Sequence, residues 1–215
     1  MQKRTFLNSL AILLCLVLPH YWPIPLFTYA PVCLGAVIWL LRSQGESLSS
    51  IGFEFKRFSW KTLPVGLAFA IGWLLTHHYL IQPLLSAVFG VKNADVSAFN
   101  FVKHNPIPYL LILLAAWLIG GWYEEIIFRG FIHSRIAGWL KGKKYAFMVS
   151  MLFTSTVFAF YHIQQGAGGV LHAGIFALIP SYLMHRYKGN LWYGMVFHAL
   201  YDTIGLTLIF LDYPF

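Results

Sequence analysis

Three apolar segments of this chain contain ionisable side chains at spacings that could support chemistry. They hold, in chain order, Glu124, Glu125 and Arg129, then His162, and then His198 and Asp202. A carboxylate and an imidazole at a sheltered site can activate a water molecule, and further polar groups can stabilise an oxyanion or hold a metal ion. The string H-E-x-x-H of soluble zinc proteases does not occur in the chain. A hydrolytic site would therefore have to combine residues from several segments.

The first segment, WYEEIIFRGF, follows the uncharged stretch 107–121. Glu125 and Arg129 are four residues apart with the acid first, so on a helix they share one face and can form an ion pair. Glu124 points in another direction around the helix and lacks that partner. Since a charge at mid-bilayer costs about 2.5–3.5 kcal/mol on insertion scales, an unpaired carboxylate there indicates function. We expect Glu124 to act as a general base or acid, and Glu125 and Arg129 to support it.

The other two segments each allow a structural interpretation as well. His162 lies one helical turn after Phe158, and a single histidine on an apolar helix is more often a core residue than a ligand. His198 and Asp202 share a helix face, where they could bind one water molecule together or could brace the bundle through a hydrogen bond. Considered together with Glu124, these residues favour a catalytic site over separate structural roles.

The composition places these segments in a membrane. Of the 215 residues, 59% are hydrophobic and 10% are charged, whereas a soluble domain carries about 25% charged residues. A water-soluble fold of this size could not cover its surface with so few charges. The sequence predicts an all-α fold, a polytopic membrane helix bundle, that forms a single integral-membrane domain over residues 1–215.

Apolar runs separated by Pro, Gly and charged residues predict about seven transmembrane helices, seven or eight in all. The expected ranges are 5–19, 24–41, 62–85, 107–130, 145–164, 168–187 and 190–211. The first is short for a bilayer that needs about 20 apolar residues, and it could form a helical hairpin with the second. It resembles a signal peptide, but no small-x-small cleavage site follows, so we interpret it as a retained span.

The positive charges are distributed unevenly between the two sides of this predicted bundle. With the N-terminus in the cytoplasm, all 15 Lys and Arg residues except Lys92, Lys103 and Arg129 fall in cytoplasmic loops. The positive-inside rule therefore predicts this orientation. The basic residues lie mainly between apolar runs, where they face lipid headgroups, so the lipid bilayer and not nucleic acid is the expected partner. We expect a bacterial inner (plasma) membrane.

Two connections between the expected spans stand out. Residues 43–61 contain alternating aromatic and charged side chains, a pattern that suits either a segment on the headgroup layer or a plain loop. Residues 86–105 are long for a loop in a compact bundle and could act as a lid.

The three motifs together resemble a known family. Their order, spacing and placement in apolar helices are similar to the signature of the CPBP family, the CAAX-protease and bacteriocin-processing (Abi) intramembrane proteases; the matching residues are Glu124-Glu125-x-x-x-Arg129, Phe158-x-x-x-His162 and His198-x-x-x-Asp202. The resemblance covers about residues 107–211. It implies an intramembrane endopeptidase that hydrolyses a peptide bond of a membrane-associated protein or peptide. By similarity, Glu124 and His162 would activate the attacking water, while His198 and Asp202 would stabilise the oxyanion or complete a metal site.

The resemblance leaves the cofactor open, because family members have been described both as zinc-dependent and as metal-free glutamate proteases. This chain has Asp202 where some relatives have asparagine. An amide can donate a hydrogen bond to an oxyanion, whereas an ionised carboxylate cannot. Asp202 therefore favours Zn²⁺ or another divalent metal, unless it is protonated or orients His198.

The expected ranges conflict with a shared site at one point. At about 1.5 Å per residue, the range 107–130 places Glu124 near one end of its helix, and the range 145–164 places His162 near the opposite side of the membrane. A longer fourth helix, about residues 108–139 with the glutamates near its middle, would remove most of this conflict.

Two other functions are compatible with intramembrane Glu, His and Asp residues. A proton-coupled transporter or proton relay uses such residues, although this chain has no pair of matching broken spans. A non-catalytic immunity or scaffold protein could use the same fold to bind a partner. A requirement for Glu124 in cleavage of a peptide would favour the protease over both.

Overall fold

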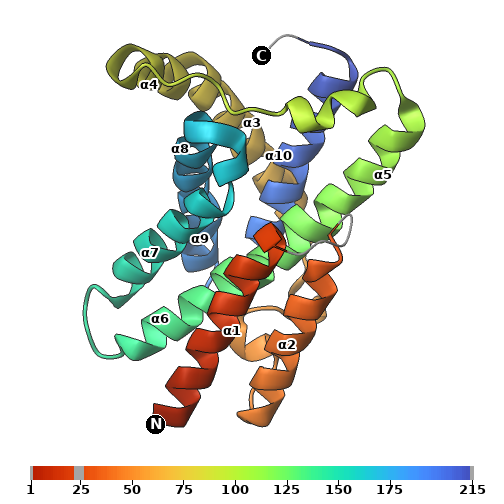
Figure 1. Ribbon diagram of the computed structural model, residues 1–215. Coiled ribbons are helices and arrows are strands. Elements are labelled where there is room, and N and C mark those ends of the chain that lie inside the picture. Colours follow the sequence, from red (N-terminus) through yellow and green to blue (C-terminus); the bar gives the residue numbers. More distant parts are fainter. Residues whose placement is uncertain (1, 22–26, 214–215) are drawn as a thin grey trace.

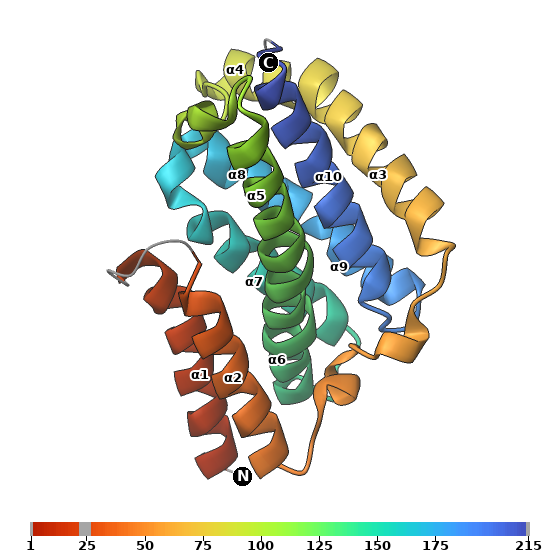
Figure 2. The same ribbon diagram turned by 90° about the vertical axis from the view of Figure 1, so that its right-hand side faces the viewer.

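The computed structural model describes residues 2–21 and 27–213 of the chain. Within these ranges the fold consists of helices and contains no β-strand, so the predicted all-α class is confirmed. Figures 1 and 2 show a helix bundle in which α1 begins at one end and α10 finishes at the other. Residues 24–26, at the start of the second expected span, lie outside the described residues.

A helical segment is present at each of the three N-terminal expected ranges. These segments are α1 Gln2–Tyr21, α2 Tyr29–Ser43, and a long helix made of α3 Thr62–Thr76, the π-helical turn η3 His77–Ile81 and α4 Gln82–Phe89. Both views show α1 and α2 side by side, and Gln44 Nε2 donates a hydrogen bond to Asn8 Oδ1 at 2.9 Å near their ends (Figures 1 and 2). The expected hairpin is therefore formed, and the small side chains of Cys15 and Cys33 are buried within the fold.

The four C-terminal expected ranges are helical as well. They contain α5 Pro106–Ala116, the π-helical η5 Trp117–Ile132 and α6 His133–Trp139; then α7 Ala146–Tyr161; then η6 Ile163–Gln165, α8 Gly166–Phe176 and α9 Leu178–Arg186; and finally α10 Trp192–Phe210. Besides η6, which is also a 3-10 turn, the described residues form three such turns between the longer elements: η1 Leu48–Ile51, η2 Phe55–Arg57 and η4 Ser97–Val102.

The helix that carries the two glutamates is longer than the range 107–130. It runs without a break from Pro106 to Trp139, a length of 34 residues. Pro106 occupies the first turn, where a proline needs no hydrogen-bond donor. The expected end near Arg129 was wrong because the charge of that residue is paired inside the bundle and does not mark a membrane surface. The glutamates consequently lie near the middle of the helix, as the longer alternative requires.

His162 directly follows the last residue of α7 and is not part of a longer span. The chain turns there through η6 into α8, and Gly166 adopts a left-handed backbone conformation with φ of 74°. Figure 1 shows α7 and α8 meeting at this turn within the bundle. The turn brings His162 to the level of the glutamates, which removes the remaining conflict between the expected ranges.

Within residues 2–21 and 27–213, four helical segments are long and apolar enough to cross a membrane: Thr62–Phe89, Pro106–Trp139, Ile163–Arg186 and Trp192–Phe210. The apolar helices α2 and α7 are shorter than this limit. Large hydrophobic side chains such as Leu75, Leu110 and Phe160 are exposed on the outside of the bundle, as expected for surfaces that contact lipid. These observations support a helical membrane bundle, and the count of seven spans stays a prediction.

The connection 43–61 is docked onto the bundle and is not a plain loop. Phe53 is buried against Trp122 and Trp192, with ring centroids 5.4 and 5.6 Å away. Trp192 Nε1 donates a hydrogen bond to the carbonyl oxygen of Glu54 at 2.8 Å. Phe55 and Trp60 remain largely exposed, so the segment combines an anchored core with aromatic side chains that suit the headgroup layer.

The connection after α4 crosses the end of the bundle that contains the C-terminus of α10 (Figure 1). We call residues 90–105 the capping segment. Its Val102 is buried with Ile112 and Leu206, and the backbone N–H of Asp95 donates to the carbonyl oxygen of Gln165 at 3.0 Å. Lys103 Nζ lies 2.6 Å from Asp212 Oδ1, and its hydrogen bond and charge hold the pKa of Asp212 below its usual value.

Helices α3 and α10 pack closely against each other at Gly66 of α3. A Cβ atom at Gly66 would lie 2.8 Å from Val196 Cγ1 and 2.9 Å from the backbone nitrogen of Phe197. No Cβ atom in a relaxed protein approaches a backbone atom so closely, so the two helices could not keep this distance with a larger residue. Small residues at such crossings are typical of membrane helices.

We therefore predict that Gly66→Val destabilises the protein, by about 1–3 kcal/mol as for other overpacked contacts. Gly72→Val is the matched control on the same helix, because a Cβ atom at Gly72 would meet nothing within 4 Å. Thermal unfolding in detergent micelles should show a lower midpoint for Gly66→Val alone. Equal midpoints for the two variants would contradict the close packing of α3 on α10.

Candidate active site

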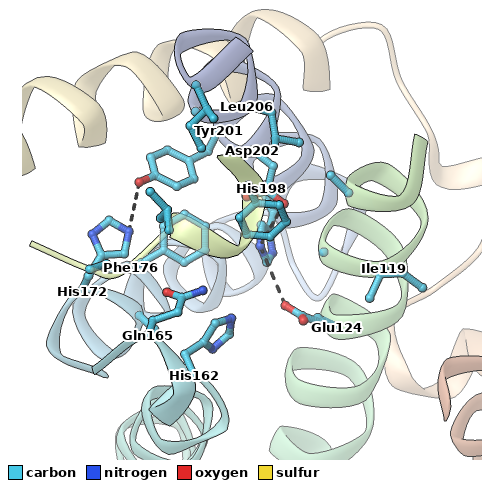
Figure 3. Close-up of a pocket in the computed structure, with 18 of the residues that line it drawn as sticks. Ile119, Glu124, His162, Gln165, His172, Phe176, His198, Tyr201, Asp202 and Leu206 are labelled. Atoms are coloured by element: carbon cyan, nitrogen blue, oxygen red, sulfur yellow. Dashed lines mark hydrogen bonds and ion pairs between the residues drawn. The ribbon is translucent and has the colours of Figure 1, made fainter. Parts of the chain in front are cut away.

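A cavity of about 380 Å³ lies inside the bundle and contains all four candidate catalytic residues on its wall. Glu124 comes from η5, His162 from the turn after α7, and His198 and Asp202 from α10. Asn93, Ala94, Val96 and Phe99 of the capping segment form another part of the wall. The structure thus brings together residues of the three motifs (Figure 3).

Glu124 lies on the π-helical stretch η5 and is buried, with 7% of its surface exposed. One of its carboxylate oxygens, Oε2, is 3.9 Å from His198 Nε2, beyond hydrogen-bonding distance. A π-helical stretch is a widened helix that is frequent at functional sites. The carboxylate of Glu124 faces the cavity. Among the described residues, no Lys or Arg side chain forms a salt bridge with it.

Two glycines just before the glutamates allow α10 to approach η5. A Cβ atom at Gly120 would collide with Asp202 Oδ2, and one at Gly121 would lie 2.9 Å from the Cβ atom of Ala199. The close approach puts His198 and Asp202 beside Glu124. These glycines are not among the predicted site residues, although a Gly-Gly pair in an apolar helix is a signal for close helix packing.

His198 is held by a chain of buried charged groups. Its Nδ1 atom is 2.8 Å from Glu125 Oε1, and the same oxygen is 3.1 Å from Arg129 Nη1. Arg129 Nη2 also donates to the carbonyl oxygen of Ala177 at 3.2 Å, and the guanidinium lies 4.4 Å from the ring centre of Phe158. The predicted pair of Glu125 and Arg129 is confirmed, whereas the bond from Glu125 to His198 was not predicted.

This bond fixes how His198 faces the cavity. An ionised carboxylate only accepts hydrogen bonds, so the proton of the shared bond lies on Nδ1. The Nε2 atom then points to the cavity, where it is 3.7 Å from Asp202 Oδ2. His198 and Asp202 share a helix face as predicted, but at this distance they do not form the bracing hydrogen bond that was the structural alternative. The bracing partner of His198 is Glu125.

His162 is oriented by the backbone of its own helix. Its Nδ1 atom donates to the carbonyl oxygen of Phe158 at 2.9 Å, and the two rings lie 4.5 Å apart. Since Nδ1 is the donor in this bond, Nε2 is the nitrogen that is free to act in the cavity. Figure 3 shows His162 and Glu124 pointing into the same space from two sides.

The side chains that line the cavity include the residue types that can bind a metal ion. Among the residues that the structure describes, no group of three His, Cys, Asp or Glu side chains is placed to hold a metal ion. A catalytic zinc site needs three such protein ligands. His198 binds Glu125 through Nδ1, a bond that zinc-bound histidines also make to a carboxylate, and its Nε2 atom faces the cavity. As placed, the described side chains do not form the three-ligand set of a catalytic zinc site.

The chain was also compared with known proteins. Residues 106–204 match the family described as Type II CAAX prenyl endopeptidase Rce1-like. The matched residues include all four candidate catalytic residues and the paired Glu125 and Arg129. No curated protein and no solved structure matched the chain. The family resemblance that the three motifs indicate is confirmed by the matched family.

We predict that Arg129→Met strongly destabilises the protein, because it leaves the carboxylate of Glu125 buried without its cation. Breaking a buried pair in this way costs about 3–5 kcal/mol. Arg42→Met is the control, since Arg42 is exposed at the end of α2. Thermal unfolding of both variants in micelles tests the prediction, and it is wrong if Arg129→Met unfolds at the same temperature as the control.

Proposed function

We propose that the chain, whose residues 106–204 match the Rce1-like family of type II CAAX prenyl endopeptidases, acts as an intramembrane endopeptidase. The proposed substrate is a membrane-associated protein or peptide, and a prenylated CAAX tail is the first to be tested. The protein is an integral membrane protein of a protease family, so the reaction is hydrolysis of a peptide bond.

One observation carries the proposal. Glu124, His162, His198 and Asp202, which come from three different helical segments, line a single cavity within the membrane bundle. Charged and polar side chains in a membrane face a water-filled or protein interior, and they are retained where they serve a function. A carboxylate, two imidazoles and space for substrate are the parts that water activation requires.

Glu124 is the proposed general base. Its carboxylate takes a proton from a water molecule as the water oxygen bonds to the carbonyl carbon of the substrate. His162, whose Nε2 atom is free, orients that water by accepting its second hydrogen. When the carbon–nitrogen bond breaks, the proton held by Glu124 passes to the leaving nitrogen, which restores the carboxylate.

His198 is the proposed oxyanion donor. Its Nδ1–H group is already donated to Glu125, so donation to the oxyanion requires a second proton on Nε2. Arg129 and Glu125 hold the ring in place for this role. Asp202 cannot donate while ionised, and its Oδ2 atom, 3.7 Å from Nε2, is too distant to orient His198 through a hydrogen bond. A preorganised donor of this kind is worth about 10²–10³ in rate.

We also propose the orientation that the basic residues predict, with the N-terminus in the cytoplasm. Figures 1 and 2 support it, because the start of α1 and the α6–α7 and α9–α10 connections, which carry many of the cytoplasmic basic residues, lie in the half of the bundle away from the capping segment. The capping segment lies at the other end. A bacterial inner membrane remains our expectation for the location.

We predict that Glu124→Ala and His162→Ala each lower cleavage by at least about 10²-fold, because both groups take part in activating water. The assay uses a quenched fluorescent peptide with a farnesylated CAAX end and the protein in liposomes. Glu54→Ala is the control, since Glu54 lies outside the cavity and pairs with Lys56. Cleavage that persists in both variants would refute the assigned roles. Proton flux without cleavage by the parent chain would instead favour a transporter.

We predict that metal removal leaves cleavage within about twofold, because the proposed steps use only side chains and water. The parent chain is treated with 1,10-phenanthroline and dialysed before the same assay. Loss of cleavage that added Zn²⁺ restores would show that a metal ion takes part, and the roles of His198 and Asp202 would then be those of ligands.

A further inference from the structure

A second polar cluster lines the same cavity and takes no part in the proposed reaction. It consists of His77 on η3, His172 on α8 and Tyr201 on α10. The Tyr201 hydroxyl is 3.0 Å from His172 Nε2. The rings of His172 and His77 lie 4.3 Å apart at an angle of 82°. Three helices thus each place one polar side chain at this point, which Figure 3 shows for His172 and Tyr201.

The cluster has an unused hydrogen-bonding group. His77 Nε2 is buried and has no hydrogen-bond partner in the structure as described. Buried polar atoms are almost always paired, so an unpaired one that lines a cavity indicates a missing ligand or water. His77 also begins a π-helical turn in the middle of a long apolar helix, and such turns are frequent at functional sites.

The side chains at this end of the cavity suit a ligand with acceptor oxygens. The acidic residues that line the cavity are Glu124 and Asp202, and both face His198. Around His77 and His172 the wall instead offers imidazoles, a phenol and the side-chain amides of Gln82, Asn93 and Gln165. These groups can donate hydrogen bonds and carry no negative charge that would repel an acceptor.

The cluster lies close to the proposed catalytic residues. The ring of Phe176 is 4.9 Å from that of His198 and 6.1 Å from that of His172, so one aromatic ring separates the two groups. An extended peptide advances about 3.3–3.6 Å per residue. A substrate cut beside His198 would therefore reach the cluster within about three residues.

We propose that His77, His172 and Tyr201 form a subsite that binds acceptor oxygens of the substrate peptide within about three residues of the cut bond. The inference rests on the proposed endopeptidase function and extends it to substrate recognition. The bound oxygens belong either to the C-terminal carboxylate of the peptide or to a peptide carbonyl group. These three residues are positioning residues for the substrate and do not act on the reacting atoms.

The test replaces each imidazole with a ring of similar size that makes no hydrogen bonds, in His77→Phe and His172→Phe. The probe is the farnesylated CAAX reporter peptide, made with a free C-terminal carboxylate and as the C-terminal amide. We expect KM to rise about 2- to 13-fold, the loss typical of one hydrogen bond, while kcat stays unchanged. His185→Phe is the matched control, because His185 is exposed and lies outside the cavity. Unchanged KM, or a fall in kcat alone, overturns the subsite.

The two forms of the probe identify the bound group. If it is the carboxylate, amidation raises KM of the parent chain and adds little in His77→Phe. If it is a carbonyl group, amidation has the same effect on both proteins.

Binding of both probe forms is also measured in a Glu124→Gln background, where no cleavage is needed. Weaker binding in the His77→Phe and His172→Phe versions supports the subsite even if the parent chain cleaves nothing, an outcome that would refute only the proposed function. Equal binding in all versions, or no binding of either form, overturns the subsite.

Discussion

The structure depends on keeping ionised groups paired inside a bundle that faces lipid. Arg129, Glu125 and His198 form one connected chain from α10 into η5, and each is nearly or fully buried. Removing any member would leave the others without a partner in a medium that stabilises charge poorly. This requirement fixes the rotation of η5 relative to α10. Glu124 directly precedes Glu125 in η5, so the same rotation turns the side chain of Glu124 toward the cavity.

Close helix packing makes this pairing possible. Gly120 and Gly121 remove the side chains that would keep α10 away from η5, and Gly66 does the same between α3 and α10. The π-helical geometry of η5 places a run of buried residues from Tyr123 to Ile132 along the interior. The capping segment contributes part of the cavity wall and lies at the end of the bundle away from α6. Small residues thus allow the helices to approach closely, and the paired charged residues determine how η5 and α10 are aligned.

Much of this arrangement can be predicted from the sequence. Long apolar runs identify membrane helices, and charged residues within such runs need partners. The pairing of Glu125 with Arg129 follows from a spacing of four residues, which fixes the two side chains on one helix face. The match of residues 106–204 to the Rce1-like family likewise agrees with the three motifs and their order. The first expected range of the fourth helix, 107–130, ended too early because Arg129 resembles a membrane boundary when its partner is not considered, whereas the longer alternative of about 108–139 is close to the observed helix.

Other features depend on contacts between distant segments and leave little signal in a single sequence. The bond from Glu125 to His198 joins residues 73 positions apart in the chain. The turn that places His162 in the same cavity wall depends on how α7 and α8 pack. His77 and His172 were each visible as histidines in apolar helices, but only the folded chain shows that they lie together with Tyr201 at the cavity wall.

The central claim is that Glu124 drives hydrolysis of a peptide bond at this sheltered cavity. Its most direct test compares peptide termini across whole membranes from cells that contain the parent chain or the Glu124→Gln variant. We predict at least one membrane-associated protein with a new terminus that appears only with the parent chain. Identical sets of termini in the two membranes, with both proteins inserted at equal levels, would contradict the account.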